Sequence, residues 1–87
     1  VFKVQILASS TKLPSNSPRF KKRDDVDCYE EGGMYKYTIG ASTNYNEINR
    51  MRGTLAETFP GAFVIAFRNG EKMNITEAIR MFKNKRR

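Results

Sequence analysis

The stretch MYKYTIGAS, residues 34–42, decides the fold because it has the pattern of a strand with two different faces. Tyr35, Tyr37 and Ile39 alternate with Lys36 and Thr38, as side chains on a β-strand do. We expect the first set to face a core. The second set then lies on the other side of a sheet, where it meets solvent or a ligand.

The residues on either side of this stretch predict further strands. Residues 26–30 (VDCYE) form a candidate strand, and Gly32 and Gly33 separate it from the opening stretch. Glycine supplies the positive φ values of tight hairpin turns, so an antiparallel pair is expected. Residues 2–8 (FKVQILA) predict the first strand. Residues 9–18 are rich in Ser and Pro, which leaves room for at most a helical turn around residues 19–22.

After Gly40 the apolar period changes to that of a helix. Asn44, with Glu47 three residues later, suits a helix N-terminus, and Pro60-Gly61 ends the pattern. One buried stripe is predicted from spacings of three and four, made of Ile48, Met51, Leu55 and Phe59. Residues 62–67 (AFVIAF) predict a fourth strand, residues 71–73 a short extension, and residues 74–82 a second helix.

These elements predict an α+β fold of two layers. Its four-stranded antiparallel sheet carries helices on one face, with a C-terminal helix added, and its other face is open. In the fourth strand, Phe63, Ile65 and Phe67 are assigned to the core. The open face is expected to carry Gln5, Leu7, Asp27, Tyr29, Lys36, Thr38, Val64 and Ala66.

Length and charge bound the possibilities. The 87 residues predict a single domain, 1–87, and the start at Val1 suggests a piece of a longer protein. The net charge of +7 comes from two basic clusters, residues 21–23 and residues 83–87, while five of the nine acids lie in residues 24–31. Such patches attract polyanions or are simply solvated surface.

The sequence lacks the residues that several kinds of catalytic and metal-binding sites require. With one cysteine and no histidine, the chain has no internal disulfide, His/Cys zinc site, Ser-His pair or Cys-His pair. We therefore expect no catalytic residue, no metal and no cofactor in this domain, and we interpret Cys28 as a small packing residue. The acids of residues 24–31 are interpreted as a solvated strand edge. No apolar run approaches the roughly 20 residues of a membrane span.

Two of the predicted strands resemble a known family. FKVQILAS, residues 2–9, is similar to the first strand of the bacterial sporulation-related repeat (SPOR) domain, whose pattern is roughly F-x-V-Q-I-G-S-F. YKYTIGAS, residues 35–42, is similar to the family's third strand, and the order of elements agrees over most of residues 1–68. More narrowly, the combination of these strands with EEGGMYKYTIG (residues 30–40), FPGAFVIAFRNGEKMNITEAI (residues 59–79) and the basic C-terminal end resembles the domain that follows the catalytic domain in some Gram-negative N-acetylmuramoyl-L-alanine amidases.

The resemblance implies a SPOR-like, ferredoxin-like fold and a non-catalytic module that binds peptidoglycan glycan strands stripped of their stem peptides. The parent protein would be a periplasmic, zinc-dependent amidase of the cell envelope, with its catalytic domain upstream. The family's strand-one Gln matches Gln5, its outward basic residue matches Lys36, and Thr38 takes the next outward position. Tyr29 is added because an exposed ring can lie against a sugar. Small residues, with the hydroxyls of Ser9 and Ser42, are expected to leave room together at one end of the sheet.

Two other functions remain open at this stage, beside a sheet face with no ligand. One is a protein-interaction or dimerisation module, to which Leu7 and Val64 would add apolar area. The other is RNA binding, since residues 60–67 (PGAFVIAF) partly match an RNA-recognition strand. RNA is disfavoured because Phe63 and Phe67 have core parity, whereas aromatics that stack on bases lie on the open face. Neither nucleic acid nor a membrane span is expected.

Overall fold

The computed structural model describes residues 1–85, so Arg86 and Arg87 of the basic C-terminal cluster lie outside the described residues. The chain is α+β, with two helices and a five-stranded antiparallel sheet in the order β2-β3-β1-β4-β5. The elements are β1 (Phe2–Ser9), the 3-10 helix η1 (Pro18–Phe20), β2 (Val26–Glu31), β3 (Met34–Ser42), α1 (Tyr45–Leu55), β4 (Phe63–Arg68), β5 (Glu71–Met73) and α2 (Ile75–Lys85). The predicted number of four strands is wrong, because the expected extension at residues 71–73 pairs with β4 and forms a fifth strand.

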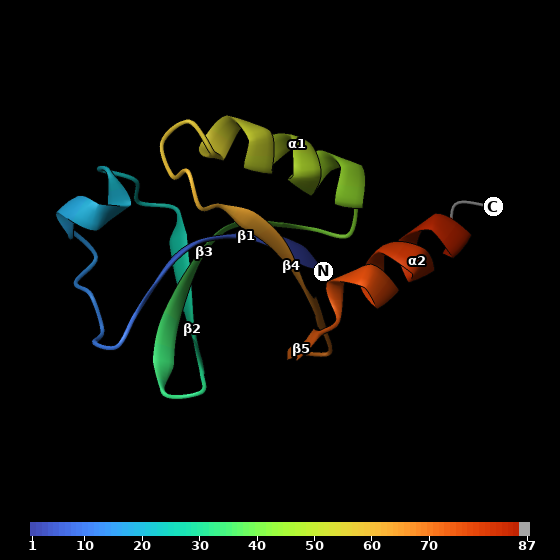
Figure 1. Cartoon of the computed structure of the whole chain (residues 1–87), viewed down its shortest axis with the longest axis horizontal. Coiled ribbons are helices and arrows are strands. Elements are labelled where there is room, and N and C mark those ends of the chain that lie inside the picture. The colour runs from blue at the N-terminus through green and yellow to red at the C-terminus, as the bar shows by residue number, and fades with distance from the viewer. Residues whose placement is uncertain (86–87) are drawn as a thin grey trace.

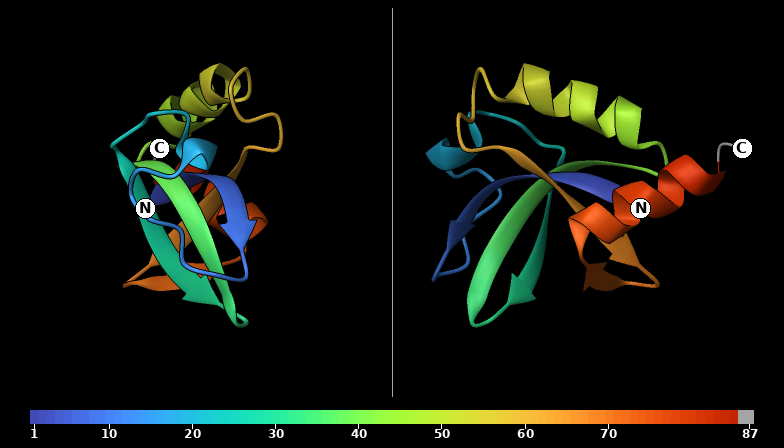
Figure 2. Two further views of the ribbon diagram at one scale, coloured as in Figure 1. Left: turned by 90° about the vertical axis from the view of Figure 1, so that its left-hand side faces the viewer. Right: turned by 45° about the vertical axis from the view of Figure 1, so that its right-hand side comes forward.

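The sheet is curled into an arch. The β2–β3 hairpin and the β4–β5 hairpin bend away from α1 like two legs, and β1 runs between them (Figure 1 and Figure 2). Both helices lie on the convex side, α1 over the centre of the sheet and α2 beside β4. No helix of the described chain covers the concave side, as the prediction of helices on one face requires.

Two predicted local signals are present in the structure. Gly32 and Gly33 have φ values of 59° and 78° and form the β2–β3 turn, as expected. Asn44 caps α1, since its Oδ1 accepts the backbone N–H of Glu47 at 3.2 Å. The 3-10 helix is the helical turn allowed by the Pro-rich segment, and it is held by Phe20, which packs on Tyr37 with ring centroids 5.0 Å apart.

The predicted end of the first helix is wrong. The helix ends at Leu55 instead of reaching Phe59, and the chain continues through turns. Phe59 nevertheless stays in the core, and its N–H donates to the Leu55 carbonyl at 2.7 Å. The apolar spacing therefore reported burial correctly, while the backbone had already left the helix.

The predicted faces of the fourth strand are also wrong. β4 pairs with β1 so that Ala66 lies opposite Phe2 and Val64 opposite Val4, and these residues belong to the core or pack against it. Phe63, Ile65 and Phe67 therefore point to the concave side. Both sets of alternating residues in β4 are apolar, and the smaller set lies under the helices, where Ala66 and Ala78 are both buried.

Leu7 does not lie on the open face either. The β1–β3 register shifts between Gln5 and Leu7, and Leu7 then pairs with Tyr37 on the core side. An irregularity of this kind adds a residue to one strand and turns the following side chain to the other face. Alternation counted along the sequence cannot include such a shift.

Helix α1 approaches the sheet closely at Gly40, which has a φ of 79°. A Cβ at this position would lie 2.5 Å from the Met51 sulfur.

In the described part of the chain, no helix is long and apolar enough to cross a membrane.

Candidate functional site

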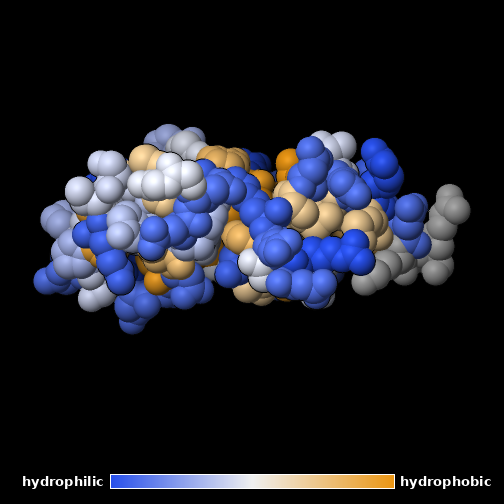
Figure 3. Space-filling view, turned by 90° about the horizontal axis from the view of Figure 1, so that it is seen from below, coloured by the Kyte–Doolittle hydropathy of each residue, from blue (hydrophilic) through white to orange (hydrophobic). Residues whose placement is uncertain are grey.

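The concave face is the surface that the arch leaves free of helices, and every strand contributes to it. Its hydrophilic side chains dominate the view from below, with apolar atoms showing between them (Figure 3). Strand alternation, the strand registers and the side-chain contacts place these residues on the concave face: Lys3, Gln5, Asp27, Tyr29, Glu31, Lys36, Thr38, Phe63, Ile65, Phe67 and Lys72.

The floor of the concave face is closed to solvent. Gln5 is 6% exposed, Thr38 1% and Ile65 3%. The Tyr29 hydroxyl donates to Gln5 Oε1 at 2.8 Å, and the Tyr29 ring meets Phe67 edge-on with centroids 5.1 Å apart. The expectation that Gln5 and Thr38 lie on an open surface is therefore wrong, because the curl of the sheet brings β2 and β4 together above them.

An ion-pair cluster joins the two legs of the arch. Glu31, at the end of β2, accepts hydrogen bonds on Oε1 from Lys36 of β3 and from Lys72 of β5, the latter at 3.0 Å. Strands β2 and β5 are the opposite edges of the sheet. Lys36, predicted as an outward basic residue, is therefore on the expected face, but it is paired with a carboxylate of this chain.

The cluster shifts the pKa values of two of its members. The hydrogen bonds from Lys36 and then Lys72 lower the pKa of the Glu31 carboxyl, because they stabilise its ionised form. Partial burial acts to lower the pKa of Lys72. The hydrogen bond to Glu31 and the nearby negative charge outweigh this effect, and the pKa of Lys72 is raised.

Aromatic side chains that the sequence had assigned to the core are the main addition to the site. Phe63 pairs with Gln5 across β1 and β4 and is 47% exposed. Phe67 lies beside Tyr29, and the Lys3 ammonium stands 5.2 Å from its ring centroid. No signal in residues 62–67 could have revealed these positions, since both alternating sets of the strand are apolar.

The two predicted serines do not form one site. Ser9 pairs with Tyr35 and Ser42 with Phe2, so they lie at opposite ends of the β1–β3 pair. The expectation of a shared space is wrong because antiparallel strands end at opposite edges. Each hydroxyl accepts a local backbone N–H, Ser9 that of Thr11 at 3.2 Å and Ser42 that of Asn44 at 3.0 Å.

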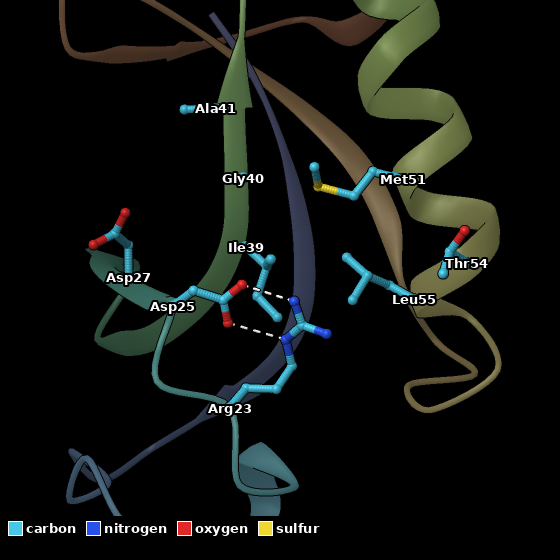
Figure 4. A pocket seen from close by; sticks show the side chains of 9 residues that line it. All are labelled: Arg23, Asp25, Asp27, Ile39, Gly40, Ala41, Met51, Thr54 and Leu55. Atoms are coloured by element: carbon cyan, nitrogen blue, oxygen red, sulfur yellow. Dashed lines mark hydrogen bonds and ion pairs between the residues drawn. The ribbon is translucent and has the colours of Figure 1, made fainter.

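A separate hollow of about 400 Å³ lies between α1 and the outer end of β3 (Figure 4). Its apolar wall includes Ile39, Met51 and Leu55, and at its mouth Arg23 makes a two-pronged ion pair with Asp25, with N–O distances of 3.0 and 2.7 Å. Their mutual hydrogen bonds raise the pKa of Arg23 and lower that of Asp25. The pair thus remains charged.

Among residues 1–85, no three His, Cys, Asp or Glu side chains are placed to hold a metal ion. Cys28 is exposed on edge strand β2, so its interpretation as a packing residue is wrong. The outward-facing position follows from its place in an edge strand that the helices do not cover.

The concave face thus combines the exposed ring of Phe63, the buried side chains of Gln5, Thr38 and Ile65, and three lysines. The lysines are Lys3, Lys36 and Lys72. Comparison of the chain with protein-family models, with curated proteins and with solved structures found no match.

Proposed function

We propose that this domain is a SPOR-like, non-catalytic module that binds glycan strands of peptidoglycan on its concave face. In this proposal it holds an upstream N-acetylmuramoyl-L-alanine amidase at the cell wall, in the periplasm. The resemblance of residues 2–9 and 35–42 to SPOR strands motivates the proposal. Tethering of this kind raises the local concentration of an enzyme at its polymer.

The observation that carries the proposal is the exposure of Phe63 on the face without helices. A sugar ring has apolar C–H faces and polar edges, so it pairs well with an aromatic ring flanked by hydrogen-bonding groups. Tyr29 and Lys3 lie on the same face as Phe63. In this proposal Gln5 does not contact the sugar itself. It positions Tyr29, because its Oε1 accepts a hydrogen bond from the Tyr29 hydroxyl.

The structure bears differently on the two alternative functions, a dimerisation module and RNA binding. Leu7 and Val64 pack against the core, so they add no apolar area to a dimerisation surface. For RNA, the argument from core parity no longer applies, because Phe63 and Phe67 are on the concave side. Salt dependence separates the two polymers, since contacts to a row of phosphates lose affinity steeply with salt and contacts to the hydroxyl, acetamido and C–H groups of sugars do not.

The test is sedimentation of the domain with intact peptidoglycan and with peptidoglycan stripped by an amidase, at low and moderate salt. We expect binding that persists at moderate salt and is stronger on stripped strands. Phe63→Ala should weaken it, whereas Arg50→Ala, on the exposed surface of α1, is the matched control and should not. Absence of binding by the folded domain to either polymer would refute the proposal.

A further inference from the structure

The ion-pair cluster of Glu31, Lys36 and Lys72 on the concave face has the composition of a carboxylate-binding site. A carboxylate of this chain, that of Glu31, already occupies it. Two ammonium groups, from Lys36 and Lys72, converge on a single oxygen of Glu31. The cluster has two positive charges and one negative charge. Lys3 adds a further positive charge on the same face, where its ammonium lies over Phe67.

The occupant can be displaced. The Glu31 side chain is 40% exposed and lies at the end of β2, next to the Gly32-Gly33 turn, so it can leave without disturbing the packed core. Ion pairs exposed to this degree contribute little to stability. The side chains of Lys36 and Lys72 are only 21% and 32% exposed, so their positions are more constrained than that of Glu31.

The chemistry of the proposed ligand supplies a competing carboxylate. An amidase that cleaves the bond between N-acetylmuramic acid and L-alanine leaves a free lactyl carboxylate on the sugar. In intact peptidoglycan that same carbon is an uncharged amide. A pair of lysines distinguishes these two states, since an ammonium group binds an ionised oxygen more strongly than an amide oxygen.

We propose that Lys36 and Lys72 bind the lactyl carboxylate of a muramic acid unit, which takes the place of Glu31 on the concave face. This inference rests on the proposed function and gives it a chemical basis for preferring stripped strands. Glu31 is then an internal competitor that keeps the two lysines paired in the absence of glycan. Tyr29, which sits on the same strand as Glu31, lies beside the site.

The experiment compares three ligands: intact peptidoglycan, stripped glycan, and stripped glycan whose lactyl carboxylates have been converted to primary amides. The unmodified domain should bind stripped glycan about fivefold more tightly than the amidated form, the scale of one exposed ion pair. This preference should shrink as salt is raised. Free N-acetylmuramic acid should compete for the domain better than N-acetylglucosamine.

Variants then assign the preference to the cluster. Glu31→Gln should strengthen binding to stripped glycan and leave binding to the amidated form unchanged, whereas Glu30→Gln, at a neighbouring exposed residue, should alter neither. Lys72→Met should remove the preference for the carboxylate. The ligand comparison on the unmodified domain remains decisive if a variant fails to fold.

The outcomes separate the two proposals. Equal binding of stripped and amidated glycan, unaffected by Glu31→Gln, overturns the carboxylate site and leaves the glycan-binding function standing. In that case the cluster only joins the legs of the arch. Failure to bind any of the three ligands overturns both, and binding that collapses with salt on every polymer points to a polyanion instead.

Discussion

Replacement of Gly40 by alanine tests the close packing of α1 on the sheet at this residue. The backbone at Gly40 has a φ of 79°, and an added Cβ would lie 2.5 Å from the Met51 sulfur. A left-handed conformation costs a residue with a Cβ about 1–2 kcal/mol. The overpacking adds about 1 kcal/mol, near the low end for such changes, because the Met51 side chain is flexible and can rotate away.

We therefore expect Gly40→Ala to lower the free energy of unfolding by about 2–3 kcal/mol, a large part of the stability of a small domain. The assay is urea unfolding followed by circular dichroism. Gly53→Ala is the matched control, because Gly53 is inside α1 and a Cβ there meets nothing within 4 Å. That change should stabilise the domain by up to about 1 kcal/mol, through helix propensity.

A second variant divides the cost of Gly40→Ala into its two parts. Combining it with Met51→Ala removes the steric conflict and retains the backbone strain, so the two changes together should cost less than the sum of their separate effects. A Gly40→Ala domain within about 0.5 kcal/mol of the original would refute the reasoning, because the left-handed conformation alone exceeds that value.

Three further predictions address the cap and the concave face. Asn44→Ala should cost about 1 kcal/mol in urea unfolding, since it removes the cap of α1; an unchanged midpoint would contradict the cap. Tyr29→Phe should cost about 1–3 kcal/mol, because it leaves Gln5 Oε1 without its donor; an unchanged free energy of unfolding would contradict this role of the hydroxyl. The lowered pKa of Glu31 should contribute a small amount of stability, as expected for an exposed ion pair, which is present above the pKa of an unfolded glutamate and is lost as pH falls through its folded value. The measurement is urea unfolding of the original domain and of Glu31→Gln between about pH 3 and about pH 7, which spans the usual range of carboxyl pKa values. Free energies of unfolding that change with pH in parallel for the two proteins would contradict the prediction.

Local signals in the sequence predicted local structure well. Gly32 and Gly33 specify the hairpin, because few other residues adopt the backbone angles of that turn. Asn44 and Glu47 specify the start of α1 through one hydrogen bond, of 3.2 Å, from the Glu47 N–H to the Asn44 side chain. The predicted stripe correctly identified Ile48, Leu55 and Phe59 as buried, while Met51 is only partly buried. It did not identify the helix end, since apolar spacing does not record where the backbone leaves the helix.

The face of each strand was less predictable, and the candidate site depends on it. Phe63 is exposed on the concave side only because β1 and β4 adopt one of two possible registers, and both sides of β4 are apolar. Leu7 turns to the core through a register shift that no sequence pattern marked. The burial of Gln5 follows from the curl of the sheet, whose ion pair joins Glu31 and Lys72 across 41 residues of sequence.

The most direct test of the account is a backbone amide NMR titration of the domain with stripped glycan oligosaccharides. Glycan binding on the concave face predicts shifts concentrated at Lys3, Tyr29, Phe63 and Lys72, with the exposed surface of α1 unaffected. Shifts confined to α1 or to the hollow beside Arg23, or no shifts at saturating glycan, would contradict it.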